Sequence, residues 1–395
     1  MKKFLLILTL IILNGCNEIR QTQIEKEKFE SLYKNHTDRN LLVFMDGTGN
    51  DKSTNTNIYQ MYELSVKKAN KGTAIIPFYI QGVGTHWYDQ IRGGTMGEGL
   101  NENICLAYKL LVENYKEGDK IFIFGFSRGA YSSRSLNGLI EFSNLLDINK
   151  IDADKLEDEI DSLFEVYNDT NDGRMDFEKR LRKNIEEKFK NKMVEKKVVV
   201  TAIGVFDTVP ALGIKRDDFP DDHRTSLYAK KGFHALSLDE QRYDFRLLRF
   251  DPNKVSSEQT LKEVWFSGAH ANVGGGYGDS NGLESIARNW MLNEFAEYDI
   301  FDDVESIDCT KPATCEYGVL HDEFLDSPLF DEFGISRRRP QHHNDFIHGN
   351  VICRIEKDTP LDKPHKVREP NGKYLPFNLK MPIKEHYQIL PFDCN

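Results

Sequence analysis

The 395-residue sequence predicts an α/β fold with a mainly parallel central sheet and flanking helices. Two observations predict it. Short apolar runs rich in β-branched and aromatic residues alternate with stretches whose apolar residues recur at helical spacing. Polar residues with chemical capacity follow several of these runs, at the strand ends where open α/β sheets bind ligands. An order of strand, helix, strand implies parallel pairing through crossover helices.

The first part of the chain contains three predicted strands and three predicted helices. The strands are expected at 41–45, 73–80 and 120–124. The apolar faces of the helices are expected to carry, in turn, Ile58, Met61 and Tyr62; then Ile104, Tyr108, Leu111 and Tyr115, with Gly118 as the stop signal; then Leu136, Leu139 and Ile140.

A charged segment, 147–197, interrupts the sheet pattern with two amphipathic helices. One apolar stripe contains Leu156, Ile160, Leu163 and Tyr167, and the other contains Phe177, Leu181, Ile185 and Phe189. Helices inserted between core strands predict a helical cap over an active site. A solvated helical excursion with no gating role fits the same pattern, so both interpretations stay open.

The sheet pattern resumes with predicted strands at 198–206 and 263–267, and the last eighty or so residues look irregular. These elements predict one α/β domain over 40–380, with the helical insertion at 147–197. The remaining segments are a signal peptide at 1–15, a polar tether at 16–39 and a C-terminal tail at 381–395.

The N-terminus has the features of an export signal. Lys2 and Lys3 precede a ten-residue apolar run, 4–13, which is too short to span a bilayer but suits a signal-peptide core. The following Leu13-Asn14-Gly15-Cys16 resembles the lipobox of bacterial lipoproteins. This resemblance implies cleavage before Cys16, acylation of that residue, and anchoring to the cell envelope by lipid. A plain secretory signal that happens to contain a cysteine is the alternative.

Composition and charge narrow the partners that we expect. The formal net charge is −11, and loss of Lys2 and Lys3 with the signal would make it −13. A negative chain is a poor ligand for nucleic acid or anionic lipid, so membrane contact would depend on the anchor and on apolar surface. Cys105 is expected to be a buried thiol. Export would allow disulfides among Cys309, Cys315, Cys353 and Cys394, in any of three pairings.

Residues 125–129, Gly-Phe-Ser-Arg-Gly, form a GxSxG pattern between a predicted strand and a predicted helix. A serine on such a sharp turn exposes its hydroxyl at the top of a sheet, and the flanking glycines avoid clashes in the turn. We therefore interpret Ser127 as a nucleophile. A glycine-rich turn that serves only helix–strand packing is the alternative.

Asp207 and His270 follow two later predicted strands, which gives the chain order Ser, Asp, His of α/β-hydrolase triads. His270 would act as the base that activates Ser127, and Asp207 would orient the imidazole. Asp46 and Asp279 are secondary candidates for the acid. His234, in what looks like a helical setting, suits a structural hydrogen bond better than a catalytic role.

The expected reaction needs a second group of residues, which stabilise the oxyanion. The backbone N–H of Arg128 is one expected donor, and Gly47 or Thr48 in the loop after the first strand is the other. No spacing in the sequence resembles a zinc site, and the chemistry requires neither metal nor cofactor.

The same motifs resemble a known family, the α/β-hydrolase domain shared with type VI secretion phospholipase effectors, long catalogued as a bacterial and fungal domain of unknown function. The resemblance implies a serine esterase that acts on glycerophospholipid or another acyl ester, without a cofactor. The matching stretches are 44–50, 82–85, 125–131, 205–209, 234–240 and 265–270, with weaker echoes at 347–351 and 374–376.

One departure from that family concerns biology. Delivered toxin effectors carry no lipoprotein signal, so the expected anchor at Cys16 questions a toxin role and leaves the hydrolase chemistry intact.

Two other functions remain as alternatives: a non-catalytic surface lipoprotein on a hydrolase scaffold, and a metal-dependent phosphohydrolase that uses Asp46. The second is weakened by Thr48, which stands where such an enzyme wants another carboxylate.

Overall fold

The computed structural model describes residues 28–84, 96–169, 177–210, 223–277, 282–304, 319–321, 338, 340, 345–356, 374, 376 and 378–392. Its centre is an eight-stranded sheet in the order β2-β1-β3-β4-β5-β6-β7-β8, in which every neighbouring pair is parallel. The strands are β1 Asn40–Met45, β2 Ile75–Ile80, β3 Lys120–Phe126, β4 Ala202–Phe206, β5 Lys231–Ser237, β6 Thr260–Phe266, β7 Phe346–His348 and β8 Gln388–Leu390.

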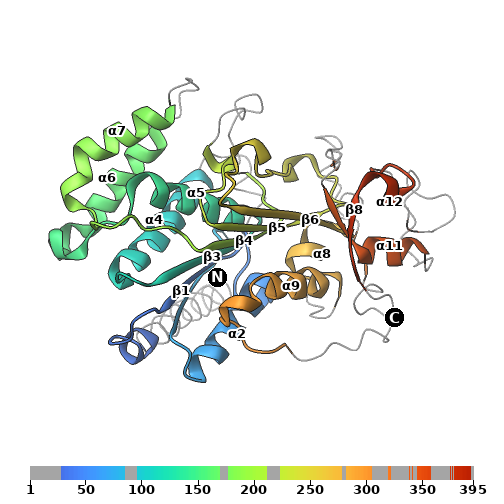
Figure 1. The fold of residues 1–395 in the computed structure, drawn as a ribbon, viewed down its shortest axis with the longest axis horizontal. Coiled ribbons are helices and arrows are strands. Elements are labelled where there is room, and N and C mark those ends of the chain that lie inside the picture. The colour runs from blue at the N-terminus through green and yellow to red at the C-terminus, as the bar shows by residue number, and fades with distance from the viewer. Residues whose placement is uncertain are drawn as a thin grey trace, which may run out of the picture.

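Helices cover both faces of this sheet (Figure 1). One layer contains α4 Met96–Asn114, α5 Ser127–Ser143, α6 Leu156–Asp169 and α7 Phe177–Phe189. The other contains α2 Asn57–Asn70, α8 His270–Gly274 and α9 Leu283–Glu294, and α11 Gly349–Glu356 and α12 Ile383–His386 lie near the β8 edge. The predicted α/β-hydrolase-like fold is therefore confirmed.

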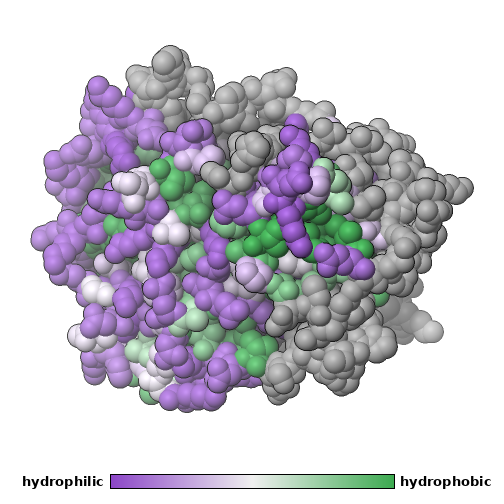
Figure 2. All heavy atoms as spheres, turned by 45° about the vertical axis from the view of Figure 1, so that its right-hand side comes forward, coloured by the Kyte–Doolittle hydropathy of each residue, from purple (hydrophilic) through white to green (hydrophobic). Residues whose placement is uncertain are grey.

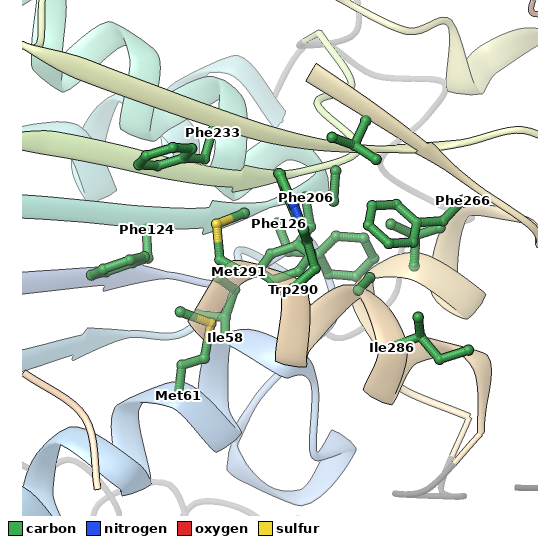
Figure 3. Close-up of a cluster of buried hydrophobic side chains, with 14 of the residues drawn as sticks. Ile58, Met61, Phe124, Phe126, Phe206, Phe233, Phe266, Ile286, Trp290 and Met291 are labelled. Atoms are coloured by element: carbon green, nitrogen blue, oxygen red, sulfur yellow. The ribbon is translucent and has the colours of Figure 1, made fainter. Parts of the chain in front are cut away.

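Alternation along the strands distributes apolar side chains between the two helical layers. In β1, Leu41, Val43 and Met45 pack into one core with α4 and α5, whereas Leu42 and Phe44 pack into the other. Figure 3 shows the second core, where Phe124, Phe206 and Phe233 extend from three strands toward Met61 of α2 and Met291 of α9. Burial on both faces explains why the strands appear in the sequence as nearly continuous apolar runs.

The insertion at 147–197 forms the two expected helices. Its α6 packs on α4, and α7 packs on α5 and α6, so the apolar stripes extend one layer of the domain. Leu163, Tyr167 and Leu181 are buried in this core. The described residues of the insertion pack on the helical layer, and whether the insertion also gates a site stays open.

Two predicted boundaries differ from the structure. Residues 28–39 of the expected tether pack on the domain: Phe29 and Tyr33 are buried in the core, and the Tyr33 hydroxyl donates to the carbonyl of Ala69. The expected C-terminal tail contributes β8, which pairs with β7 and extends the sheet. Each segment packs through only a few aromatic or β-branched residues, and the polar residues around them gave no sign of this packing in the sequence.

The cysteines and the surface complete the description. Cys105 is a free, partly buried thiol, as expected, and burial raises its pKa to about 12. Cys353 is disulfide-bonded, whereas Cys16, Cys309, Cys315 and Cys394 lie outside the described residues. On the face in Figure 2, hydrophilic residues cover much of the described surface, and hydrophobic residues show in several places, the largest of them right of centre. Within the described ranges, no helix has the length and apolarity needed to cross a bilayer.

Candidate active site

Ser127 occupies a tight turn between β3 and α5, with a φ of 57°. Positive φ is uncommon for a residue with a Cβ and is found where a fold forces a side chain into a special position. A Cβ on Gly125 would lie 2.4 Å from Ser133 Oγ, and one on Gly129 would lie 2.2 Å from the Met45 carbonyl oxygen. The turn therefore requires both glycines of the GxSxG pattern, as a nucleophile elbow does.

The parallel register brings the ends of β1, β3, β4 and β6 to one edge of the sheet. Met45 pairs with Gly125, and Phe126 pairs with Phe206, so the residues that follow these strands lie close together. Ser127 and His270 line the same cavity of about 340 Å³, together with Thr48 and Arg128. Ser127 and His270 are 143 positions apart in the sequence, and strand pairing brings them to the same cavity.

His270 begins α8, and its ring is held by Asp207. The Nδ1 of His270 lies 2.6 Å from Oδ2 of Asp207, and the imidazole lies between the rings of Phe126 and Phe245, with centroid distances of 4.6 and 4.9 Å. The backbone N–H of His270 donates to Glu240. Asp207 and two aromatic rings thus fix the imidazole, Glu240 holds the backbone of the same residue, and His270 lines the cavity.

Asp207 is buried and has four donors. The Ser237 N–H and hydroxyl donate to its two carboxylate oxygens at 2.9 Å each, and His270 and the guanidinium of Arg338 complete the set. Burial alone would raise the pKa of Asp207, but the charge of Arg338 and the bond from His270 outweigh it and hold that pKa well below its ordinary value. Asp207 is therefore ionised at neutral pH, and Nδ1 of His270 carries a proton that it donates.

Burial lowers the pKa of His270, while the bond to Asp207 and the charge of that carboxylate oppose the shift. The positive charge of Arg242 also disfavours the imidazolium and so lowers the pKa of His270 further. The net shift is downward, so the ring is neutral at neutral pH. A neutral imidazole with Nδ1 protonated has its Nε2 lone pair available as a proton acceptor, which is the state a general base requires.

The structure separates the candidate oxyanion donors. Arg128 is in the first turn of α5, so its backbone N–H has no carbonyl partner within the helix. Gly47 adjoins Ser127, but its N–H donates to Oδ1 of Asp46 at 2.8 Å and is already used. This contact favours Thr48, which lines the cavity, over Gly47 as the donor from that loop, and the donor role itself stays a prediction.

Asp46 is a buried residue that stabilises the loop after β1. Its carboxylate accepts from the hydroxyls of Thr56 and Tyr79 at 2.6 and 2.8 Å, as well as from Gly47. Burial raises the pKa of Asp46 to about 6, although these three donors oppose the rise. Asp279, the other secondary candidate, lies outside the described residues. In the described ranges no group of three His, Cys, Asp or Glu residues could hold a metal ion.

His234 lies on strand β5, which corrects the helical setting expected for it. Its Nε2 lies 3.2 Å from the N–H of Thr208, which follows Asp207, and its Nδ1 lies 2.9 Å from Glu263. His234 is fully buried and holds the loop after β4 in place, which is the structural hydrogen-bonding role expected of it.

Three residues of the site were not predicted. Arg338 pairs with Asp207, Glu240 accepts from His270, and Arg242 lines the cavity while it donates to both carboxylate oxygens of Glu240. The motif at 234–240 signalled part of this arrangement, because it contains both Ser237 and Glu240. Nothing local to Arg338 signals its contact, which joins residues 131 positions apart.

Comparisons with known proteins now add to this geometry. An uncharacterized protein of Saccharomyces cerevisiae is 29% identical over 233 residues, which are 54% of this chain and 33% of that protein. The chain therefore spans about a third of that relative's length.

Two solved structures have low similarity. A crystal structure of an uncharacterized Pseudomonas aeruginosa protein has a TM-score of 0.39 and 16% identity, covering 81% of this chain and 52% of that one. Esterase 2 of Thermogutta terrifontis, phosphoramylated by tabun, has a TM-score of 0.33 and 12% identity, covering 68% and 86%.

The model of one protein family, the Tle1-like catalytic domain of type VI secretion phospholipase effectors, matches residues 39–294. These residues are more than half of the chain and include Ser127, Asp207 and His270. The chain belongs to the family of Tle1-like phospholipase effector catalytic domains.

Proposed function

We propose that this protein is a serine hydrolase of the lipase and esterase kind, which cleaves carboxylic esters through Ser127, His270 and Asp207. The observation that carries the proposal is the shared cavity: Ser127, on a turn with positive φ, and His270, held by an ionised Asp207, line it together. Nucleophile, base and orienting acid at the ends of three parallel strands make up the arrangement that acyl transfer requires.

In the first half of the proposed reaction, Nε2 of His270 takes the proton of Ser127 as Oγ attacks the ester carbonyl carbon. The negative charge that develops on the carbonyl oxygen is stabilised by the N–H groups of Arg128 and Thr48. His270, now an imidazolium beside the Asp207 carboxylate, returns the proton to the departing alkoxide. The products of this half are an alcohol and an acyl ester on Ser127.

In the second half, water replaces the alcohol. His270 removes a proton from the water as it attacks the acyl carbonyl, and then gives a proton back to Ser127 Oγ as the carboxylic acid leaves. Each half uses the same base and the same oxyanion donors, so one rigid site serves both steps.

The acyl ester of a lipid, and of a phospholipid in particular, is the proposed substrate, since the matched family is that of phospholipase effector domains. We also propose that the chain is exported and held in the cell envelope by acylation of Cys16, which the lipobox-like sequence supports. Lipid anchoring would place Ser127 near a surface that contains its substrate.

The geometry gives less support to a phosphohydrolase that uses Asp46. Its carboxylate is buried and bound by Thr56, Tyr79 and Gly47, so a substrate phosphorus would have to displace these donors. A non-catalytic scaffold is the alternative that an experiment must address, because the fold by itself implies no activity.

The test is labelling with a fluorophosphonate probe, which reacts only with an activated serine, combined with hydrolysis of short acyl esters and phospholipid. The expected result is a single labelled site at Ser127 and ester turnover that disappears in Ser127→Ala. Ser132→Ala is the matched control: it removes another buried hydroxyl from α5 and should leave labelling unchanged. An unlabelled wild-type protein without turnover would overturn the proposal in favour of the scaffold.

A further inference from the structure

The side chain of Arg128 places a buried positive charge next to Ser127. Its relative exposure is 3%, and it lines the cavity that contains Ser127 and His270. Nε and Nη2 of its guanidinium are buried, and neither has a hydrogen-bond partner within the described part of the chain. Burial lowers the pKa of Arg128 only to about 10, so the group is a cation at neutral pH.

Neighbouring buried arginines are satisfied in ways that Arg128 is not. Arg134, also on α5, donates to the carbonyls of Arg224, Leu248 and Arg249. Arg242 donates to both carboxylate oxygens of Glu240. Burying a guanidinium without such acceptors costs folding free energy. An acceptor on a ligand that enters the cavity would lower this cost.

A second unsatisfied donor lies in the same cavity but belongs to another element. The hydroxyl of Thr48, in the loop after β1, is buried and has no hydrogen-bond partner within the described ranges. The charged groups that act on Arg128 are Asp244, which favours the cation, and Arg242, which opposes it. The cavity therefore offers unpaired hydrogen-bond donors from two elements, the first turn of α5 and the loop after β1, and one of them is a buried guanidinium.

We propose that the Arg128 guanidinium and the Thr48 hydroxyl form a subsite for the phosphate of a glycerophospholipid substrate. This inference rests on the proposed ester hydrolase function and assigns recognition of the substrate phosphate to two residues of that site. In a glycerophospholipid the phosphate and the nearest acyl ester are attached to adjacent carbons of one glycerol. A phosphate site formed by the residue next to the nucleophile therefore suits a substrate whose phosphate and reacting ester are close together.

The chemistry of the donors supports phosphate as the ligand. Guanidinium groups bind phosphate oxygens through paired, charge-assisted hydrogen bonds, and a hydroxyl can donate to another oxygen of the same group. The protein as a whole is negative, at −11, so its general field would not attract an anionic group. A local, buried cation supplies that attraction at the one place where it also positions the ester.

The experiment measures kcat/KM for a short-chain phosphatidylcholine and for the neutral diacylglycerol with the same acyl chains. The ratio of the two values is the readout. In Arg128→Gln the ratio should fall by about 10- to 100-fold, since charge-assisted hydrogen bonds to the phosphate are lost. Arg128→Lys keeps the positive charge but loses the paired N–H donors of the guanidinium, so its ratio should fall less. Thr48→Val removes the hydroxyl donor and should also lower the ratio.

Arg246→Gln is the matched control. Arg246 is exposed on the neighbouring loop, so its removal deletes the same charge without touching the cavity, and the ratio should stay within about threefold of wild type. An Arg128→Gln ratio that stays within the same range would overturn the inference, as would an equal fall in both arginine variants.

A binding measurement on the wild-type protein keeps the test independent of how the variants fold. Glycerophosphocholine should inhibit hydrolysis of a neutral short-chain ester competitively, and inorganic phosphate should do so more weakly if the site recognises the lipid headgroup. Equal inhibition would assign the site to free phosphate, and no inhibition by either would overturn the subsite. Absence of all Ser127-dependent turnover would instead refute the proposed function, so the two failures are distinguishable.

Discussion

The guanidinium of Arg338 lies 2.5 Å from Oδ1 of Asp207, and both side chains are buried. His270 occupies the other carboxylate oxygen, so one carboxylate connects a permanent cation to the imidazole that we propose as the base. The charge of Arg338 helps to hold the pKa of Asp207 low, and a nearby cation disfavours the imidazolium form of His270.

Removal of that cation should change the pH dependence of the reaction. In Arg338→Gln the imidazolium of His270 becomes easier to form, so the acidic limb of the kcat/KM profile should move to higher pH, by about one unit or less. The variant should also lose about 3–5 kcal/mol of unfolding free energy, because Asp207 is left as a buried charge with fewer partners. Arg338→Lys should restore part of both effects. A stable variant whose acidic limb is unmoved would show that Arg338 is purely structural.

The wild-type profile offers a simpler measurement. Burial lowers the pKa of His270, and the reaction needs the neutral ring, so activity should persist as pH falls until the lowered pKa is passed. The acidic limb of kcat/KM should therefore have its midpoint below about 6.5, the ordinary histidine value. A midpoint above that value would contradict the downward shift that burial is expected to give His270.

Asp46 should make the protein less stable as pH rises through weakly acidic values. Its pKa in the fold is about 6, above the ordinary value of 3.8, so the folded state holds a proton that the unfolded chain releases. The stability from this group is present below about pH 4 and is lost as pH rises through 6, a change of about 3 kcal/mol. The unfolding free energy can be measured with urea at pH 4 and at pH 7. The change between the two pH values should be smaller by about this amount in Asp46→Asn than in the wild type. An equal difference in both proteins would contradict the raised pKa.

The elbow itself can be tested with an added methyl group. In Gly129→Ala the new Cβ would meet the carbonyl oxygens of Met45 and Asp46 at 2.2 and 2.4 Å, and backbone cannot move aside cheaply. We expect a loss of about 1–3 kcal/mol or more in unfolding free energy, together with loss of Ser127 labelling. Gly232→Ala is the control, since its Cβ would meet the flexible end of Leu227. Full labelling of a stable Gly129→Ala protein would argue against the tight turn.

Much of the central sheet could be predicted from sequence because its strands are buried on both faces and appear as apolar runs. Strand β5 was missed, since His234 and Gly232 interrupt its pattern. Only the tertiary structure shows that Glu263 and Thr208 satisfy this buried histidine. Strands β7 and β8 have three residues each, too few for any periodicity to appear.

The site followed the same rule. Ser127, Asp207 and His270 come directly after strands, so strand order alone brought them to one edge, and their catalytic roles remain a proposal. Arg338 is 131 positions from Asp207 in the sequence, and only the tertiary structure shows their contact. Gly47 and Thr48 could not be distinguished as oxyanion donors, because a sequence does not reveal that the Asp46 side chain accepts from the N–H of Gly47.

The extent of the sheet has a consequence for how the protein can be shortened. The family match ends at residue 294, yet β7 and β8 continue the sheet beyond it, and Arg338 lies beyond it as well. A protein cut at that boundary would present the backbone of β6 as an unprotected edge, which invites intermolecular strand pairing and aggregation. It would also leave Asp207 without its buried counter-charge. The unit that can be expressed and engineered is therefore larger than the matched residues 39–294.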